Sequence, residues 1–287
     1  MSSSPSQDAL PVPVHVPYMM QTVSIIDDPE AFAKLPQRHQ NRLIMVKANR
    51  DNAPQAVKEF IQSQCFLDGR ELFVAQGRAD VDDIRSTLQA AVDQGIVPAN
   101  QDKQSPDSND LRNWLKHFGI GIDCSAFVQH TLTRLVKACF QKMGADPIKH
   151  LNYEVGWIRT NSLYSKLNTD PPISERFEHF HTPREARPGD ILVKKGHIRL
   201  VANVLTLEDN SITLEMAEST SAKDIPNGLP TEEDDIGPRL IQVHYPKPDL
   251  PISQQSPSQK GPINRFTPES NESGYFLGRL KVLSYHC

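Results

Sequence analysis

The stretch RPGDILVKKGHIRLVANVLTLEDNSITLEMAEST, residues 187–220, decides the expected fold. A Pro-Gly-Asp turn opens it, and three runs of β-forming residues follow, separated by Lys-Lys-Gly and Glu-Asp-Asn-Ser turns. Short runs of this kind between turn residues predict a meander of antiparallel strands. Two later segments, IGPRLIQVHYP (residues 236–246) and GYFLGRLKVLSY (residues 274–285), predict two further strands.

The sequence upstream of this stretch is mainly helical in pattern. Residues 80–94 and 111–118 have apolar positions three and four apart, as an amphipathic helix requires. The signal is strongest after residue 124, where it comprises Val128, Leu132, Leu135, Val136, Cys139 and Phe140. The short apolar run LIMV, residues 43–46, predicts a strand. Helices followed by a meander of strands predict an α+β fold.

The chain of 287 residues divides into three parts by composition. Residues 1–17 are rich in Ser, Pro and Val and predict a flexible N-terminal arm. Residues 18–104 predict a mostly helical appendage, and residues 105–287 predict the main domain. Within that domain, residues 246–264 are rich in Pro, Ser and Gln and predict a long surface loop.

Composition and charge exclude several classes of partner. The formal net charge is -4, from 31 basic and 35 acidic residues, so we expect no nucleic acid partner. No stretch approaches the roughly 20 apolar residues that span a bilayer, so we expect no membrane partner. The first residues lack the basic and apolar regions of a secretory signal, which predicts a cytoplasmic protein or one exported without a signal peptide. The oligomeric state stays open.

Four cysteines are scattered along the chain, namely Cys65, Cys124, Cys139 and Cys287. None of them forms a C-x-x-C pair, which argues against a zinc ribbon or a thioredoxin-type redox site. We therefore expect free thiols, no cofactor and no metal. A metal site built from Cys124, His197 and a carboxylate ranks low, because structural zinc sites usually have paired ligands a few residues apart.

The segment GIGIDCSAFVQHTL, residues 119–132, places Cys124 where a Gly-rich turn becomes a helix. We interpret this cysteine as lying off the apolar stripe of the helix, whereas Cys139 and Cys65 are assigned to the core. A helix N-terminus favours the thiolate, which is the reactive form of cysteine. Asp123 is suited to cap the helix, and the backbone N–H groups of Cys124 and Ser125 could receive an oxyanion.

A cysteine nucleophile needs a base, and His197 is the best placed of the ten histidines. It opens a predicted strand directly after a Gly turn. A third polar group should hold the imidazole in its productive tautomer. Glu218 ends the next predicted strand and shares a face with Leu214 and Met216, and Glu215 is the alternative.

Three motifs in order carry a resemblance to a known family. They are Asp-Cys-Ser-Ala-Phe-Val-Gln (residues 123–129), Arg-Pro-Gly-Asp-Ile-Leu (187–192) and Gly-His-Ile (196–198). Together they resemble the NlpC-type cell-wall cysteine peptidases of the papain-like superfamily, over roughly residues 111–222. The resemblance implies a papain-like α+β fold with N-terminal helices packed on a small antiparallel β-sheet and the nucleophile at a helix N-terminus.

The same resemblance implies the site. Cys124 would be the nucleophile, His197 the base and then the acid, and Glu218 the polar third residue on the following strand. This sequence departs from the family pattern at two of these motifs: Ala126 replaces the usual Gly, and Arg199 replaces a Gly or another small residue. The Tyr-x-x-Gly-Gly segment that commonly precedes the nucleophile in the family is not found.

The expected activity is that of a cysteine peptidase or amidase. Cys124 would attack an amide carbonyl and form a thioester, which water then hydrolyses. The expected substrate is a peptide or amide, and the resemblance implies peptides of the peptidoglycan type. Two alternatives stay open, namely an acyltransferase or deamidase on the same Cys–His scaffold and a catalytically inactive binding protein of the same fold.

Overall fold

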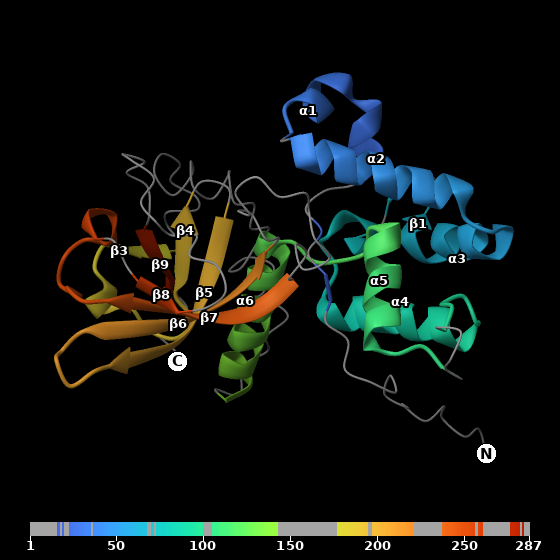
Figure 1. The fold of residues 1–287 in the computed structure, drawn as a ribbon. Coiled ribbons are helices and arrows are strands. Elements are labelled where there is room, and N and C mark those ends of the chain that lie inside the picture. Colours follow the sequence, from blue (N-terminus) through green and yellow to red (C-terminus); the bar gives the residue numbers. More distant parts are fainter. Residues whose placement is uncertain are drawn as a thin grey trace, which may run out of the picture. The chain divides into compact units, whose positions relative to one another are not determined.

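The computed structural model of the chain divides into two compact units, Met1–Asp123 and Cys124–Cys287 (Figure 1). The residues that it describes are 16–17, 19, 23–35, 37–67, 70–71, 73–99, 105–142, 177–194, 197–220, 237–255, 258–260, 276–281 and 283. The predicted boundary after residue 104 differs from this division. Helix α5 (Ser108–Phe118), predicted as part of the main domain, lies within the first unit.

The described part of the first unit is mostly helical. Its elements are η1 (Val23–Asp27), α1 (Pro29–Ala33), α2 (Gln37–Asn52), α3 (Gln55–Cys65), β1 (Phe66–Leu67), β2 (Arg70–Glu71), η2 (Phe73–Gln76), α4 (Val81–Asp93) and α5. Capping boxes at Asp80 and Asp107 begin α4 and α5 by bonding the first backbone N–H groups. Gly119 ends α5 in the left-handed conformation, with φ of 68°, which a glycine adopts without strain.

The strand expected at residues 43–46 is wrong, because these residues lie inside α2. Leu43 and Val46 are buried, whereas Ile44 and Met45 are 51% and 53% exposed. A spacing of three places Leu43 and Val46 on one face of a helix. Two of the four apolar residues are therefore buried and two are exposed. The sequence of the run does not indicate this difference.

The chain just before Cys124 packs against residues near the N-terminus of the first unit. The N–H of Ile122 donates to the carbonyl oxygen of Pro17 at 3.0 Å. A Cβ at Gly121 would lie 2.4 Å from that oxygen, so this close approach requires glycine. Val16 and Pro17 are buried, although the predicted flexible arm includes them, and residues 1–15 of that arm lie outside the described residues.

The second unit combines α6 (Cys124–Lys142) with a seven-stranded sheet, which confirms the α+β class. Every described pairing in the sheet is antiparallel, in the order β3-β9-β4-β5-β6-β7-β8. The strands are β3 (Phe177–Phe180), β4 (Ile191–Lys194), β5 (His197–Thr206), β6 (Ile212–Thr220), β7 (Gly237–Tyr245), β8 (Ser258–Lys260) and β9 (Phe276–Leu280), with η3 (Pro183–Glu185) and η5 (Ile252–Gln254) between them.

The predicted Pro-Gly-Asp turn leads into β4. Gly189 has a φ of 92°, a conformation that favours glycine. The carboxylate of Asp190 accepts the backbone N–H of Arg187 at 2.7 Å, and the N–H of Gly189 donates to the carbonyl of Val201 at 2.8 Å. These bonds fix the start of β4 against β5, the strand that begins at His197.

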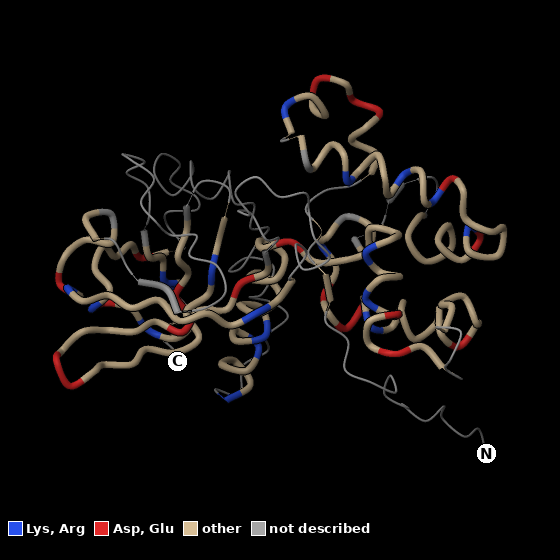
Figure 2. The backbone as a smooth tube through the Cα atoms, in the orientation of Figure 1, with Lys and Arg blue, Asp and Glu red and all other residues tan. Residues whose placement is uncertain are grey.

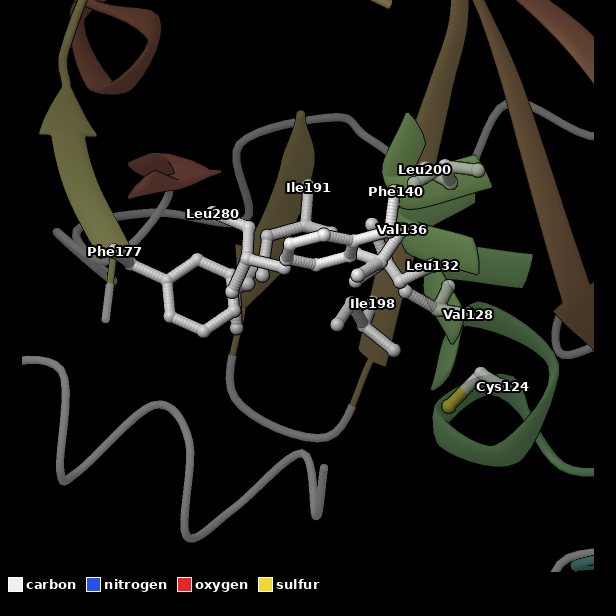
Figure 3. Close-up of a cluster of buried hydrophobic side chains, with 11 residues drawn as sticks. Cys124, Val128, Leu132, Val136, Phe140, Phe177, Ile191, Ile198, Leu200 and Leu280 are labelled. Atoms are coloured by element: carbon white, nitrogen blue, oxygen red, sulfur yellow. The ribbon is translucent and has the colours of Figure 1, made fainter. Parts of the chain in front are cut away.

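Strand alternation separates two hydrophobic clusters on the two faces of this sheet. Helix α6 covers one face, where its apolar row packs with Ile191, Val193, Ile198 and Leu200 (Figure 3). The residues between these in the sequence form the second cluster, together with apolar residues of β6 and β7. That cluster includes Leu192, Val201, Leu214, Met216, Ile241, Val243 and Tyr245. Side chains of successive strand residues therefore point alternately towards α6 and away from it.

The loop predicted at residues 246–264 is wrong in part. Residues 258–260 form β8, which pairs with β7 in the register Gln242↔Lys260, Val243↔Gln259 and His244↔Ser258. Residues 252–254 form the short helix η5, and Ile252 is buried in the second cluster. Residues 256–257 and 261–264 lie outside the described residues.

Charged residues of both signs are interspersed along the described parts of the chain (Figure 2). Helix α6 is an exception, because it carries Arg134, Lys137 and Lys142 and no acidic residue. None of the helices in the described ranges is both long and apolar enough to span a bilayer.

Candidate functional site

Cys124 is the first residue of α6, at the helix start that the sequence predicts, and it is 4% exposed. Its side chain belongs to the same cluster as Val128 and Ile198 (Figure 3). The interpretation that it lies off the apolar stripe was wrong. The row that runs back from Phe140 in steps of four ends at Cys124, because residues four apart are neighbours on a helix.

The two residues beside Cys124 are also buried. Asp123 is 6% exposed, its N–H donates to the carbonyl of Gly77 at 2.8 Å, and Arg78 Nη2 lies 3.9 Å from its carboxylate. Its role as helix cap stays a prediction. Ser125 is 3% exposed and lies in the first turn of α6. The N–H groups of a first turn are those that the helix's own hydrogen-bond ladder does not use, as the predicted oxyanion role requires.

His197 and Glu218 come together as the sequence suggests. His197 is the first residue of β5, and its Nε2 lies 2.8 Å from Glu218 Oε2. The His197 side chain is 14% exposed and the Glu218 side chain 1%. Glu218 shares the face of β6 with Leu214 and Met216, and this alternation brings its carboxylate to the start of β5.

Two arginines share the Glu218 carboxylate with His197. Arg199 Nε donates to Oε2 at 2.6 Å, and Arg239 donates to Oε1 through Nε at 2.8 Å and through Nη2 at 2.5 Å. Arg239 lies directly opposite Glu218 in the register of β6 and β7. The carboxylate thus joins three neighbouring strands. We call His197, Arg199, Glu218 and Arg239 the Glu218 cluster.

Neighbouring charges keep both Glu218 and Arg199 ionised. Burial alone would raise the pKa of Glu218, but the His197 hydrogen bond and the charges of Arg199 and Arg239 lower it far below its ordinary value. Burial lowers the pKa of Arg199 to about 10, against the opposing attraction of Glu218, so this guanidinium stays protonated at neutral pH.

The ionised state of Glu218 fixes the tautomer of the histidine. A carboxylate only accepts hydrogen bonds, so the proton of the short His197 contact resides on Nε2. In the neutral ring Nδ1 is then the nitrogen that can take up a proton. This is the arrangement in which a carboxylate orients a histidine base.

The alternative third residue does not reach the histidine. Glu215 points to the other face of β6 from Glu218, where Asn203 Nδ2 lies 3.2 Å and Gln242 Nε2 2.9 Å from its oxygens. Both of these hydrogen bonds are exposed to solvent. Of the two predicted carboxylates, the structure brings only Glu218 to His197.

Cys124 and His197 are related through the packing of α6 on the sheet. Helix α6 packs against β5 and β6, and Cys124 packs in one cluster with Ile198, the residue that follows His197. Ile198 projects towards α6, whereas His197 projects to the face of Arg199 and Glu218. The Cys124 sulfur thus lies on the α6 side of the sheet near the start of β5. The imidazole of His197 lies on the opposite side, with Glu218.

Sequence reasoning missed Arg239 as part of the site and noted Arg199 only as a departure from the family pattern. A signal for both exists in strand alternation. Arg239 has the same parity as Ile241 and Val243 in β7, and Arg199 the same parity as Val201 in β5. An arginine on the core face of a strand predicts a buried ionic partner.

The other cysteines differ from the expectation of free thiols. Cys65 and Cys124 are buried thiols that are not disulfide-bonded. Cys139 is disulfide-bonded, so the expectation is wrong for this residue, and Cys287 lies outside the described residues. Within the described ranges no group of three or more His, Cys, Asp and Glu side chains is arranged to hold a metal ion.

Comparison with known proteins gives one partial similarity. No family model matches the chain, and no solved structure matches it. Over 106 residues the chain is 31% identical to lysine–tRNA ligase from two strains of Burkholderia ambifaria. The match covers 37% of this chain and 21% of the ligase, so the chain spans about a fifth of the length of the curated relatives it matches.

Proposed function

We propose that the protein is a cysteine hydrolase with a papain-like, NlpC-like fold, acting on amide bonds through a thioester. One observation carries the proposal. The imidazole of His197 is held through Nε2 by the buried, ionised Glu218, at the start of the strand against which the helix of Cys124 packs. A histidine oriented by a carboxylate and a cysteine at a helix N-terminus are the groups of a cysteine-hydrolase site, and here they come from two elements that pack together.

The proposed reaction has two halves. His197 Nδ1 takes the thiol proton of Cys124, and the sulfur attacks the amide carbonyl carbon. The oxyanion is received by the N–H groups of Cys124 and Ser125 in the first turn of α6. The C–N bond then breaks, the leaving amine takes the proton from His197, and a thioester remains. Water, deprotonated by His197, attacks the thioester, and the acid and the free thiol are released.

The proposed substrate is a peptide of the peptidoglycan type, or another peptide or amide. The family resemblance of the three motifs around Cys124, Arg187 and His197 supports this class. The proposed compartment is the cytoplasm or the outside of the cell. We do not transfer the activity named for the lysine–tRNA ligase, because the match covers 21% of that protein.

A second candidate is a catalytically inactive binding protein of the same fold. The observation that favours it is the 4% exposure of Cys124 among apolar side chains. Burial in apolar surroundings makes a thiol inert. An acyltransferase or deamidase would use the same groups as the hydrolase, with an amine or alcohol in place of water for the transferase.

One experiment separates these candidates. The protein is incubated with muropeptides from digested peptidoglycan and with a panel of peptide amides, with and without added amine, and products are identified by mass spectrometry. We expect hydrolysis that Cys124→Ala abolishes and that the matched variant Cys65→Ala keeps. Products carrying the added amine would indicate acyl transfer. Full activity in Cys124→Ala would refute the hydrolase. A wild-type protein that is inactive, and whose Cys124 does not react with iodoacetamide, would favour the binding protein.

A further inference from the structure

The disulfide at Cys139 has a partner that the other cysteines identify. Cys139 lies in the last turn of α6 and is disulfide-bonded. The sequence has three other cysteines, Cys65, Cys124 and Cys287. Cys65 and Cys124 are not disulfide-bonded. Within a single chain, Cys287 is therefore the cysteine left to pair with Cys139.

The geometry of α6 independently excludes one of the other pairings. Cys124 and Cys139 lie at opposite ends of this helix. At 1.5 Å per residue the helix separates their backbones by about 22 Å. A disulfide joins α carbons that are only about 4.4–6.8 Å apart. The disulfide at Cys139 therefore leaves the thiol of the proposed nucleophile as it is.

The chain after β9 packs against the second half of α6. Leu280, the last residue of β9, lies in one buried cluster with Phe140 (Figure 3). Leu283 packs against the same cluster. A Cβ at Gly189 would lie 3.3 Å from Leu283 Cδ1 and 3.9 Å from Leu135 Cδ1, so both leucines border one glycine. The last described residues of the chain thus lie beside the end of α6.

Both cysteines are within reach of this contact. Cys139 follows Leu135 by four residues, which places it on the same face of the helix and about 6 Å further along the axis. Cys287 follows Leu283 by four residues, and four residues of extended chain reach up to about 14 Å. Packing therefore agrees with the pairing that elimination gives.

We propose that Cys139 and Cys287 form a disulfide that ties the C-terminal segment of the chain to α6. The bond closes nearly all of the second unit, Cys124–Cys287, into one loop. A disulfide stabilises a fold mainly by restricting the unfolded chain, and more so for a long loop. The inference goes beyond the proposed function and holds whether or not Cys124 is a nucleophile.

The chemistry of the bond bears on the compartment. The two thiols form an S–S bond and give up two protons and two electrons. An oxidant of the glutathione-disulfide class takes these up and is reduced to two thiols. The cytoplasm keeps most thiols reduced, whereas secreted proteins retain their disulfides. The disulfide therefore favours an oxidising compartment over the cytoplasm as the place where the protein acts.

Peptide mapping tests the pairing in the full chain. Free thiols are alkylated in denaturant, and the unreduced protein is digested with trypsin and analysed by mass spectrometry. We expect residues 138–142 (ACFQK) to be linked to residues 282–287 (VLSYHC), with the link lost on reduction. The peptides of Cys65 and Cys124 should be alkylated without reduction. An alkylated Cys139, or a link from it to any other peptide, would overturn the inference.

Thermal unfolding tests the stabilising effect of the bond. Cys287→Ser should lower the unfolding temperature by roughly 5–15 °C. Reductant should lower that of the wild type to the same value and leave the variant unchanged. The matched variant Cys65→Ala removes a buried thiol outside the disulfide, so it should still respond to reductant. Equal unfolding temperatures for Cys287→Ser and the oxidised wild type would overturn the stabilising role. If Cys287→Ser does not fold, the peptide map of the wild type decides.

Thiol trapping tests the compartment. Cells in which the protein occurs are quenched in acid and their thiols alkylated before lysis. A Cys139 protected from alkylation supports the oxidising compartment, and an alkylated Cys139 would overturn it. Hydrolysis is measured separately. A loss of activity in Cys124→Ala leaves the peptide map unchanged, so the inference and the proposed function fail independently.

Discussion

Two buried carboxylates, Glu218 in β6 and Asp190 just before β4, have pKa values shifted in opposite directions. Asp190 is 1% exposed and pairs with one arginine, Arg279, whose Nε and Nη2 donate to its two oxygens at 2.7 and 2.8 Å. Burial raises the pKa of Asp190, and the bonds from Arg279 and the N–H of Arg187 offset only part of that rise. Glu218 is equally buried, yet its two arginines and His197 lower its pKa.

The surroundings explain the difference. Arg279 also donates to the carbonyl of Glu185 at 2.7 Å and stacks over the ring of Phe180 at 4.3 Å, so its donors and its face serve the packing between β9 and the turn before β4. The Asp190–Arg279 pair has one negative and one positive charge, and each member also forms a hydrogen bond with a backbone group. In the Glu218 cluster two arginines and a histidine share one carboxylate, and the histidine lies at the partly exposed end. The first arrangement ties parts of the fold together, and the second also holds a histidine.

The largest predicted contrast is in catalysis. Glu218→Gln leaves His197 without an anionic partner, and we expect kcat to fall by about 10³- to 10⁴-fold, as when a catalytic histidine loses its carboxylate. Asp190→Asn breaks a pair that holds only the fold, and we expect kcat to change by less than about threefold below the unfolding temperature. Steady-state kinetics of both variants check this, and equal losses would remove the distinction between the two carboxylates.

The next contrast is in stability. Arg279→Met leaves the buried Asp190 carboxylate without its cation, and we expect a loss of about 3–5 kcal/mol in the free energy of unfolding. Arg239→Met leaves Glu218 paired with Arg199, so we expect a smaller loss, about 1–2 kcal/mol. Urea unfolding of the two variants measures both values. A larger loss for Arg239→Met would show that the second arginine is a structural necessity.

The two carboxylates should also give opposite dependences of stability on pH. The pKa of Glu218 is lowered in the fold, so its contribution is present above the ordinary glutamate value of 4.5 and is lost as pH falls through the folded pKa. The pKa of Asp190 is raised, so its contribution is present below the ordinary value of 3.8 and is lost as pH rises through the folded pKa.

Replacement of each residue makes these signs measurable. The stability cost of Glu218→Gln should shrink as pH is lowered below about 4.5, whereas the cost of Asp190→Asn should shrink as pH is raised above about 4. Unfolding free energies between pH 3 and pH 7 give both slopes. Slopes of the same sign would contradict the opposite pKa directions.

The smallest expected effect is that of Glu215. Its carboxylate bonds Asn203 and Gln242 at the exposed face of β6, so Glu215→Gln should change stability by less than about 0.5 kcal/mol. Catalysis should also be unaffected, because of these two carboxylates it is Glu218 that is hydrogen-bonded to His197. A loss of activity comparable to that of Glu218→Gln would reassign the third residue of the site.

The sequence anticipates features that local rules determine. Turn residues and alternation place the start of β5 at His197 and put Glu218 on the face of Leu214 and Met216, as the structure has them. Helix spacing and the preceding Gly-rich turn place the start of α6 at Cys124. These features depend on neighbours within a few residues, which a single sequence contains.

Features that depend on distant partners were not anticipated. The pairing of Arg239 with Glu218 follows from the register of β6 and β7, which local patterns do not specify. The pairing of residues 258–260 with β7 and the disulfide at Cys139 are likewise long-range. The LIMV run was misread for a different reason, because four apolar residues fit a strand and a helix equally well until burial separates Leu43 and Val46 from Ile44 and Met45.

The measurement that tests the central claim most directly is the rate of Cys124 alkylation by iodoacetamide as a function of pH, in the wild type and in His197→Gln, with Cys65 as the internal control. If His197 activates the sulfur, wild-type Cys124 reacts well below pH 8.5, the approximate pKa of a free thiol, and the His197 variant loses this reactivity at low pH. Cys65 should stay unreactive in both proteins. Superimposable pH profiles for Cys124 in the two proteins would contradict the account, because the imidazole would then have no effect on the reactivity of the thiol.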